Sequence, residues 1–181
     1  MEKYIAFLRG INVGGHKKVP MAKLREVLGV TGFHEVRTYI QSGNIVFKCP
    51  EKSVSELEQI IKKTIEDSFG FRVPTLVKSL AEVQKIIDDN PFTTSEYLET
   101  NSVYFTLLFD VPSGEQIRSF ESVTYPNEEF KISDSCVYLL CKKGYGNAKL
   151  NNNLIERKLK VTATARNYRT MQKLLVLASY K

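Results

Sequence analysis

Three glycines between a strand and a helix mark the segment whose residue types best suit the binding of an anion. Residues 9–15 read Arg-Gly-Ile-Asn-Val-Gly-Gly and follow an apolar strand. Glycine adopts positive φ without strain and lets backbone amides approach a ligand, and the amino end of a helix favours negative charge. Arg9, Gly14, Gly15 and Lys17 are therefore candidate binding residues. The alternative is that the glycines only build a tight connection.

This segment does not match the P-loop of nucleotide-binding proteins, in which Gly, four residues, Gly and Lys precede Ser or Thr. Gly10 and Gly15 have the required spacing, but His16 stands at the lysine position and Lys17 at the hydroxyl position. No side chain is left there to bind magnesium. The pattern thus favours a looser anion site, and we expect neither a metal nor a cofactor.

A second group of cations lies near the carboxyl end of the chain. Asn167 can cap a helix, and Arg166 and Arg169 share one stripe of that helix start with Lys173. Arginine at the amino end of a helix opposes the helix dipole by about 0.3–1 kcal/mol each, so an anionic partner would remove the conflict. The alternative partner is a glutamate from the acidic middle of the chain.

A third polar segment spans the end of the predicted second strand and the residues that follow it. Strand alternation places Arg37, Tyr39 and Gln41 on one face. Arg37 and Gln41 are candidates to line a cleft, whereas Gly43 and Asn44 favour a tight turn between two strands.

These three segments predict one basic cleft between two subdomains that binds a small ligand carrying phosphate or carboxylate. The arginines would supply charge, the loop amides would surround the anion, and three side-chain amides would orient it. The predicted ligand-binding residues are Arg9, Asn12, Gly14, Gly15, Lys17, Arg37, Gln41, Arg166, Asn167 and Arg169.

The charges are distributed unevenly around a net charge of +6. From Lys142 to the end, ten Lys and Arg accompany one acid, Glu156, whereas Glu82–Asp134 holds eleven acids and three bases. Two alternative functions follow. The basic segments would bind nucleic acid through its phosphates, or the acidic middle would dock on the basic tail of another copy. Base stacking on the sheet is not expected, since both faces of the predicted strands are apolar.

Established catalytic patterns are lacking. His16 and His34 are the only histidines, and neither has a recognisable nucleophile or metal-ligand partner, so the sequence identifies no reaction. Cys49, Cys136 and Cys141 lie in apolar segments and are expected to be reduced core residues. No apolar run approaches the roughly 20 residues of a membrane helix, and the start lacks a secretory signal. We therefore expect a cytoplasmic protein with no membrane partner.

The spacing of apolar residues predicts an α+β fold, with a ferredoxin-like β-α-β-β-α-β subdomain over residues 1–79. Ser53 and Glu56 form a capping box before the second helix, which stops at Gly70. The predicted strands are Tyr4–Leu8, Phe33–Ile40, Asn44–Phe47 and Val73–Lys78.

Residues 80–181 are predicted to form a second α+β subdomain, packed on the first, that could echo it. Capping boxes at Ser79 with Glu82 and at Ser113 with Gln116 begin two of its helices. Its strands are predicted at Val103–Phe109, Phe130–Ile132 and Cys136–Cys141. From Asn147 onward we expect two helices separated near Val161–Ala165.

Five blocks of sequence together closely resemble the bacterial family known as domain of unknown function 1697. The blocks are Leu8–Gly15, Val19–Arg25, Val36–Phe47, Glu156–Leu159 and Thr164–Thr170. The resemblance spans essentially the whole chain. It implies an α+β protein with two subdomains and assigns no biochemical role.

Two positions depart from the family pattern. Tyr168 stands where tryptophan is usual, which preserves an aromatic ring. Lys160-Val161-Thr162 replaces Gly-Val-Pro, which removes a helix stop and a rigid turn before Arg166.

Overall fold

The computed structural model describes residues 1–180, which form two compact units. The first unit consists of Met1–Lys85 and the chain from Gln172 onward, and the second unit is Ile86–Met171. Each unit holds one four-stranded antiparallel sheet, so the predicted α+β class is confirmed. Lys181, the last residue of the predicted second subdomain, lies outside the described residues. None of the helices in the described part of the chain is long and apolar enough to cross a membrane.

The elements of the first unit follow the predicted order β-α-β-β-α-β and are then followed by a third helix. They are β1 (Glu2–Leu8), α1 (Met21–Val30), β2 (His34–Tyr39), β3 (Asn44–Cys49), α2 (Val54–Phe69), β4 (Thr75–Ser79) and α3 (Leu80–Asp88). The strands lie in the order β2-β3-β1-β4, so β1 occupies an inner position between β3 and β4. The predicted capping box of α2 is present, with the Ser53 hydroxyl accepting from the Glu56 N–H at 3.3 Å.

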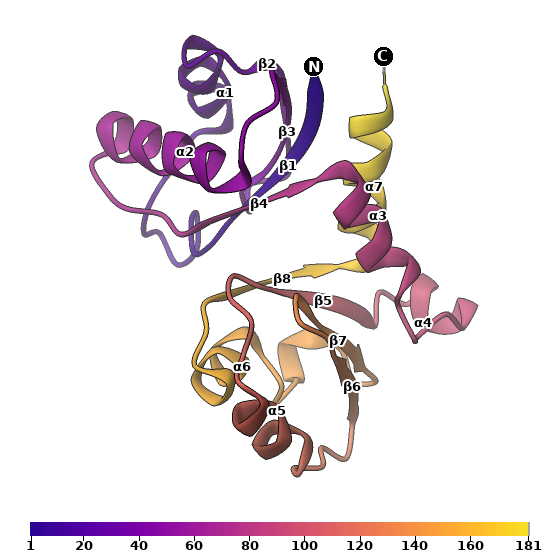
Figure 1. Cartoon of the computed structure of the whole chain (residues 1–181). Helices are drawn as coiled ribbons and strands as arrows, with labels where there is room; N and C mark the ends of the chain where they lie inside the picture. Colours follow the sequence, from indigo (N-terminus) through magenta and orange to yellow (C-terminus); the bar gives the residue numbers. More distant parts are fainter. Residues whose placement is uncertain (181) are drawn as a thin grey trace. The chain divides into compact units, whose positions relative to one another are not determined.

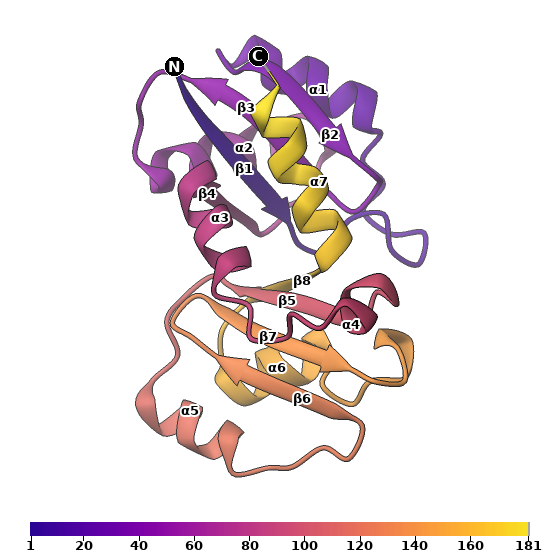
Figure 2. The same cartoon turned by 90° about the vertical axis from the view of Figure 1, so that its right-hand side faces the viewer.

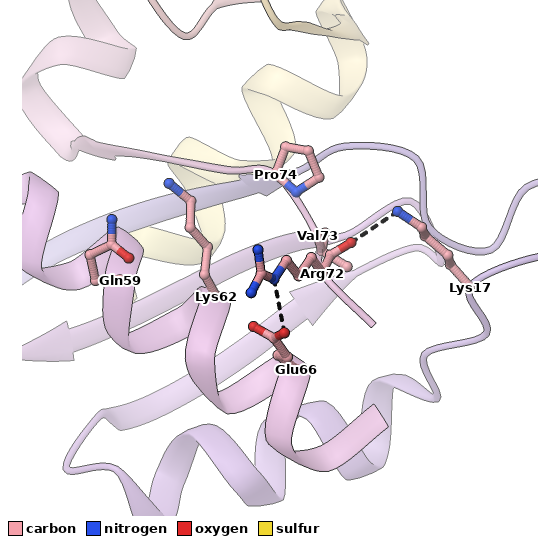
Figure 3. A pocket seen from close by; sticks show the side chains of 7 residues that line it. All are labelled: Lys17, Gln59, Lys62, Glu66, Arg72, Val73 and Pro74. Atoms are coloured by element: carbon pink, nitrogen blue, oxygen red, sulfur yellow. Dashed lines mark hydrogen bonds and ion pairs between the residues drawn. The ribbon is translucent and has the colours of Figure 1, made fainter. Parts of the chain in front are cut away.

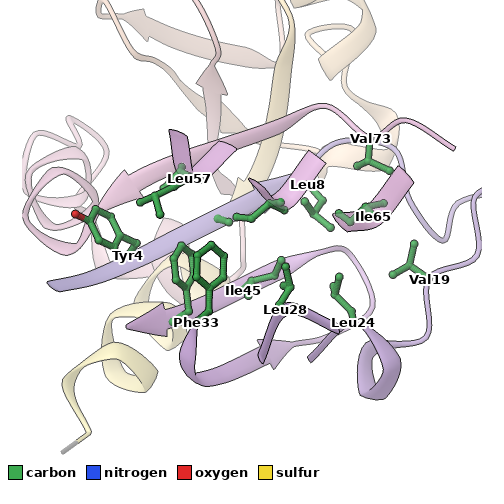
Figure 4. Close-up of a cluster of buried hydrophobic side chains, with 14 of the residues drawn as sticks. Tyr4, Leu8, Val19, Leu24, Leu28, Phe33, Ile45, Leu57, Ile65 and Val73 are labelled. Atoms are coloured by element: carbon green, nitrogen blue, oxygen red, sulfur yellow. The ribbon is translucent and has the colours of Figure 1, made fainter. Parts of the chain in front are cut away.

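The core of the first unit lies between the sheet and helices α1 and α2 (Figures 1 and 4). Phe33 and Phe47 stack there with their ring centroids 4.3 Å apart, and Tyr4 also stacks with Phe47, at a centroid distance of 5.8 Å. Leu24 and Leu28 of α1 are completely buried in the same cluster. The burial of these side chains holds both helices against one face of the sheet.

The opposite face of this sheet is covered as well. Ile5, Phe7 and Val46 are at most 5% exposed, and Figures 1 and 2 show that the part of helix α7 (Tyr168–Ser179) that belongs to this unit, from Gln172 onward, runs along this face. The Arg37 guanidinium donates to the Leu177 carbonyl of α7 at 3.5 Å. Phe7 and Phe47 are completely buried, so neither ring is available to stack on a nucleic-acid base.

The second unit repeats this organisation. Its elements include α4 (Ser95–Glu99), β5 (Val103–Leu108), α5 (Gly114–Glu121), β6 (Glu128–Ile132), β7 (Cys136–Cys141), the short 3₁₀ helix η1 (Tyr145–Asn147), α6 (Asn152–Leu159) and β8 (Ala163–Asn167). From β5 to β8 the order is again β-α-β-β-α-β, and the strand order β6-β7-β5-β8 corresponds element by element to β2-β3-β1-β4. The expected echo of the first half is therefore present in the fold.

The two units differ in the connection after their first strand. In the first unit β1 and α1 are joined by residues 9–20, whereas in the second unit β5 and α5 are joined by residues 109–113. The glycine-rich segment singled out in the sequence is thus an extended version of a connection that this fold can make with far fewer residues.

The prediction missed strand β8, helix α4 and the short 3₁₀ helix η1 of the second unit. Val161–Ala165 was expected to separate two helices, but Ala163–Asn167 forms strand β8. This strand is short, pairs with β5 on one side only and contains little apolar sequence, so its pattern is weak. Helix α4 is a single polar turn with no buried residue, and this explains why apolar spacing did not reveal it.

Helix α6 stops without the glycine that the family pattern has at this position. Lys160 caps the helix in the left-handed conformation, at φ 53 and ψ 38. Because glycine adopts this conformation without the Cβ clash, we expect Lys160→Gly to stabilise the protein by roughly 1 kcal/mol in urea unfolding. Lys158→Gly, inside the same helix, serves as the control and should destabilise it by about 1 kcal/mol. Loss of stability in both variants would contradict this account of the cap.

The three cysteines are buried and reduced, as the sequence predicts. Burial raises the pKa of the Cys141 thiol to about 12 and also raises the pKa of Cys49. Since the thiolate is the reactive form, we expect a thiol-specific disulfide reagent to label none of them at pH 8 in the folded protein and all of them in denaturant. Rapid labelling of the folded protein would show that a cysteine is exposed.

Candidate functional site

The β1–α1 loop, residues 9–20, folds into a small hairpin. The Asn12 N–H donates to the Lys17 carbonyl at 3.2 Å, and the His16 N–H donates to the Val13 carbonyl at 3.1 Å. The two residues at its tip have consecutive positive φ values, 59° for Gly14 and 79° for the next glycine. A two-residue turn of this kind needs positive φ at both positions. The turn therefore explains why glycine stands at both positions, whether or not the loop binds a ligand.

Asn12 fixes the base of this loop. Its side-chain oxygen accepts from the Val19 N–H at 2.8 Å, and its amide nitrogen donates to the carbonyls of Val19 at 3.0 Å and of Gln41 at 2.8 Å. Both amide hydrogens are therefore used within the protein. Asn12 joins the β1–α1 loop to the turn between β2 and β3.

That turn is built by the residues for which the sequence predicted a turn. The Asn44 side chain is completely buried and donates to the Tyr39 carbonyl at 3.0 Å and to the Ser42 hydroxyl at 3.1 Å. Gly43 has φ 78, and its carbonyl accepts from the Leu8 N–H at 2.8 Å. Gly43 and Asn44 thus bring the turn against the end of β1.

Lys17 connects the loop to the segment that precedes β4. Its ammonium donates to the Arg72 carbonyl at 2.9 Å, and at the start of the loop the Arg9 N–H donates to the Pro74 carbonyl at 2.9 Å. Lys17 has φ 46, a conformation that costs a non-glycine residue of order 1–3 kcal/mol. The loop therefore keeps a strained backbone at the residue whose side chain makes this connection.

A cavity of about 680 Å³ lies beside this connection (Figure 3). Its lining combines one loop residue, three residues of α2 and the segment before β4. These residues are Lys17, Gln59, Lys62, Glu66, Arg72, Val73 and Pro74. Positions 59, 62 and 66 lie on successive turns of one helix face. Three cations and one carboxylate thus face one hollow of the first unit.

The carboxylate in this cavity is already bonded to a cation. Glu66 Oε1 accepts from Arg72 Nε at 2.9 Å, and this hydrogen bond raises the pKa of the Arg72 guanidinium. Lys62 Nζ lies 3.6 Å from Glu58 Oε2, while the other oxygen of Glu58 accepts from the Val77 N–H of β4. The cavity therefore has a surplus of positive charge, with the Arg72 side chain 87% exposed.

Arg37, another predicted site residue of the first unit, faces a different neighbourhood. Besides its contact with α7, its Nη2 lies 3.7 Å from Glu35 Oε2. Glu35 also pairs with Lys48, and these two cations lower the pKa of its carboxyl group. Arg37 is thus part of an ionic group on strands β2 and β3.

The predicted site residues near the carboxyl end make hydrogen bonds inside the second unit. Arg166 is 7% exposed and donates to the Thr164 hydroxyl at 2.7 Å and to the Ala165 carbonyl at 2.8 Å. Asn167 accepts from the Thr170 N–H at 2.8 Å, which confirms its predicted helix cap. Arg169 donates to the Glu99 carbonyl at the end of α4. These contacts hold β8, the first turn of α7 and α4 together within the second unit.

Sequence reasoning identified Lys17 but missed the other cations of the cavity. Lys62 lies on the polar side of α2, where a lysine ordinarily indicates a solvated helix face. Arg72 stands in the short segment between Gly70 and β4, outside any motif. A signal was present in the polar spacing of Gln59, Lys62 and Glu66, but it does not by itself distinguish a cavity wall from an exposed surface.

Comparison with known proteins identifies the family. A family model described as "Protein of unknown function (DUF1697)" matches residues 1–138. The chain belongs to this family. A solved structure, that of the conserved bacterial protein SP0830 from Streptococcus pneumoniae, is similar to this DUF1697 protein with a TM-score of 0.75 and 23% identity. The likeness covers 98% of this chain and 99% of that chain and shows a common fold. No curated protein matches the chain.

Proposed function

We propose that this DUF1697 protein binds a small anionic ligand, carrying phosphate or carboxylate, in the cavity of the first unit. The observation that carries the proposal is the convergence of Lys17, Lys62 and Arg72 on one hollow of about 680 Å³. The single carboxylate of the lining, Glu66, is engaged by Arg72 Nε. An anion would therefore meet a net attractive site.

The guanidinium of Arg72 suits this role because one edge is held and the other is accessible. The bond from Nε to Glu66 orients the group, and its terminal nitrogens can then donate to two oxygens of one anion. Lys62, which lies one helical turn before Glu66 on α2, adds a compact positive charge. Lys17 adds a third charge from the β1–α1 loop.

The comparison between the two units supports a functional loop. From their first strand to their last, the two units have the same order of elements. The connection from the first strand to the first helix is residues 9–20 in the first unit, but only residues 109–113 in the second. Long ordered connections are uncommon unless they serve a function. This one supplies Lys17 to the cavity and holds it there at a strained backbone angle.

Calorimetric titration with inorganic phosphate and with acetate at low ionic strength tests the proposal. For phosphate we expect a Kd of about 1 mM or tighter, weakening as salt is added. Absence of a saturable signal for both anions would contradict the proposed function.

The same cations could hold the phosphates of nucleic acid. Oligonucleotide binding that falls steeply with salt, without binding of the small anions, would identify nucleic acid as the partner instead.

A further inference from the structure

The size of the cavity and its single carboxylate narrow the class of ligand that the proposed function requires. A volume of about 680 Å³ lies within the range of about 300–1,000 Å³ that is usual for small organic ligands, whereas a bare phosphate ion fills only a small part of it. The ligand that matches this space carries an organic group as well as the anion.

The charges argue against a long polyanion. Glu66 lies in the lining beside Arg72, so a second phosphate placed along the same wall would meet a carboxylate. Like charges at close range in a partly enclosed site repel each other. The site therefore favours one phosphate, bound by Lys62 and Arg72, which both line the cavity (Figure 3).

The remaining lining residues suit an uncharged, hydroxylated group. Gln59 lies one turn before Lys62 and offers both a donor and an acceptor. Glu66 accepts from Arg72 through Oε1, and its other carboxylate oxygen, Oε2, can accept from a hydroxyl of the ligand. Val73 and Pro74 give an apolar surface against which a ring can pack. Sugar rings combine hydroxyl groups with apolar carbon faces in this way.

We infer that the ligand is a phosphate monoester of a sugar, a class that includes sugar monophosphates and nucleoside monophosphates. This inference rests on the proposed anion site. The phosphate binds between Lys62 and Arg72, and the sugar hydroxyls bind Gln59 and Glu66.

Titration with ribose 5-phosphate, inorganic phosphate and ribose tests the inference. We expect ribose 5-phosphate to bind at least about tenfold more tightly than inorganic phosphate, and ribose alone not to bind. Gln59→Ala should weaken ribose 5-phosphate about tenfold and leave inorganic phosphate unchanged. Ser55→Ala, an exposed change on the same helix outside the cavity lining, is the matched control and should alter neither.

The outcomes separate this inference from the proposed function. Equal affinities for ribose 5-phosphate and inorganic phosphate would overturn the sugar phosphate assignment and leave the anion site intact. No binding of either compound would overturn both. An equal loss of affinity for both ligands in Gln59→Ala would show that Gln59 does not contact the sugar.

Discussion

Replacing Gly43 with alanine is expected to destabilise the protein by about 3 kcal/mol, the largest loss of stability that we predict. Gly43 has φ 78, and a Cβ there would lie 2.6 Å from the Leu8 Cβ and 2.9 Å from Ile11 Cδ1. The Leu8 Cβ is attached directly to the backbone of β1 and cannot rotate away. The left-handed conformation costs alanine about 1–2 kcal/mol, and overpacking a core adds about 1–3 kcal/mol.

Gly70→Ala separates the two causes of this loss. Gly70 has φ 79, nearly the same as Gly43, but a Cβ there would meet nothing within 4 Å. We therefore expect Gly70→Ala to cost only about 1 kcal/mol, from the backbone conformation alone. Both free energies of unfolding are measured by urea denaturation. Equal losses would show that the close approach between the β2–β3 turn and β1 does not constrain position 43.

Removing the charge of Lys62 is expected to lower the affinity for inorganic phosphate at least about tenfold. Lys62 lines the cavity, and its side chain is 35% exposed. In Lys62→Gln the anion loses a charged donor, while the length of the side chain is nearly preserved. The affinity is measured by calorimetric titration, and thermal unfolding checks that the variant remains folded.

Lys63→Gln is the matched control for this change. Lys63 is the next residue of α2, is 79% exposed, does not line the cavity and forms an ion pair with Asp67. Both variants remove one positive charge from the same helix, so a general effect of net charge would be equal in the two. We expect Lys63→Gln to alter the affinity less than about twofold because water and salt screen exposed charges. Equal losses of phosphate affinity in Lys62→Gln and Lys63→Gln would show that the binding is a nonspecific effect of charge.

The sequence was most informative where a local pattern has one structural solution. The Ser53–Glu56, Ser79–Glu82 and Ser113–Gln116 pairs all form the predicted capping boxes, because two hydrogen bonds within one helical turn decide the outcome. Strand β8 was missed because it is an edge strand whose stability comes from pairing with β5, a partner distant in sequence. Pairing of that kind leaves little trace in local spacing.

The candidate site was harder to predict because its cations come from three separate segments. Lys17 belonged to a recognisable loop, but Lys62 and Arg72 approach it only because α2 packs on the sheet and β4 pairs with β1 inside it. Asn12 shows a different difficulty. An asparagine side chain can bind a ligand as well as it can bind the backbone. In the structure the Asn12 amide holds two backbone segments together. Sequence spacing does not distinguish a residue that holds a loop from one that faces a ligand.

Amide chemical-shift mapping by NMR during a titration with inorganic phosphate tests the central claim most directly. We expect saturable shifts that are largest for Lys17, for α2 from Gln59 to Glu66, and for Arg72 and Val73. Saturable shifts confined to Arg166 and Arg169, or no saturable shifts at all, would contradict an anion site in the cavity of the first unit.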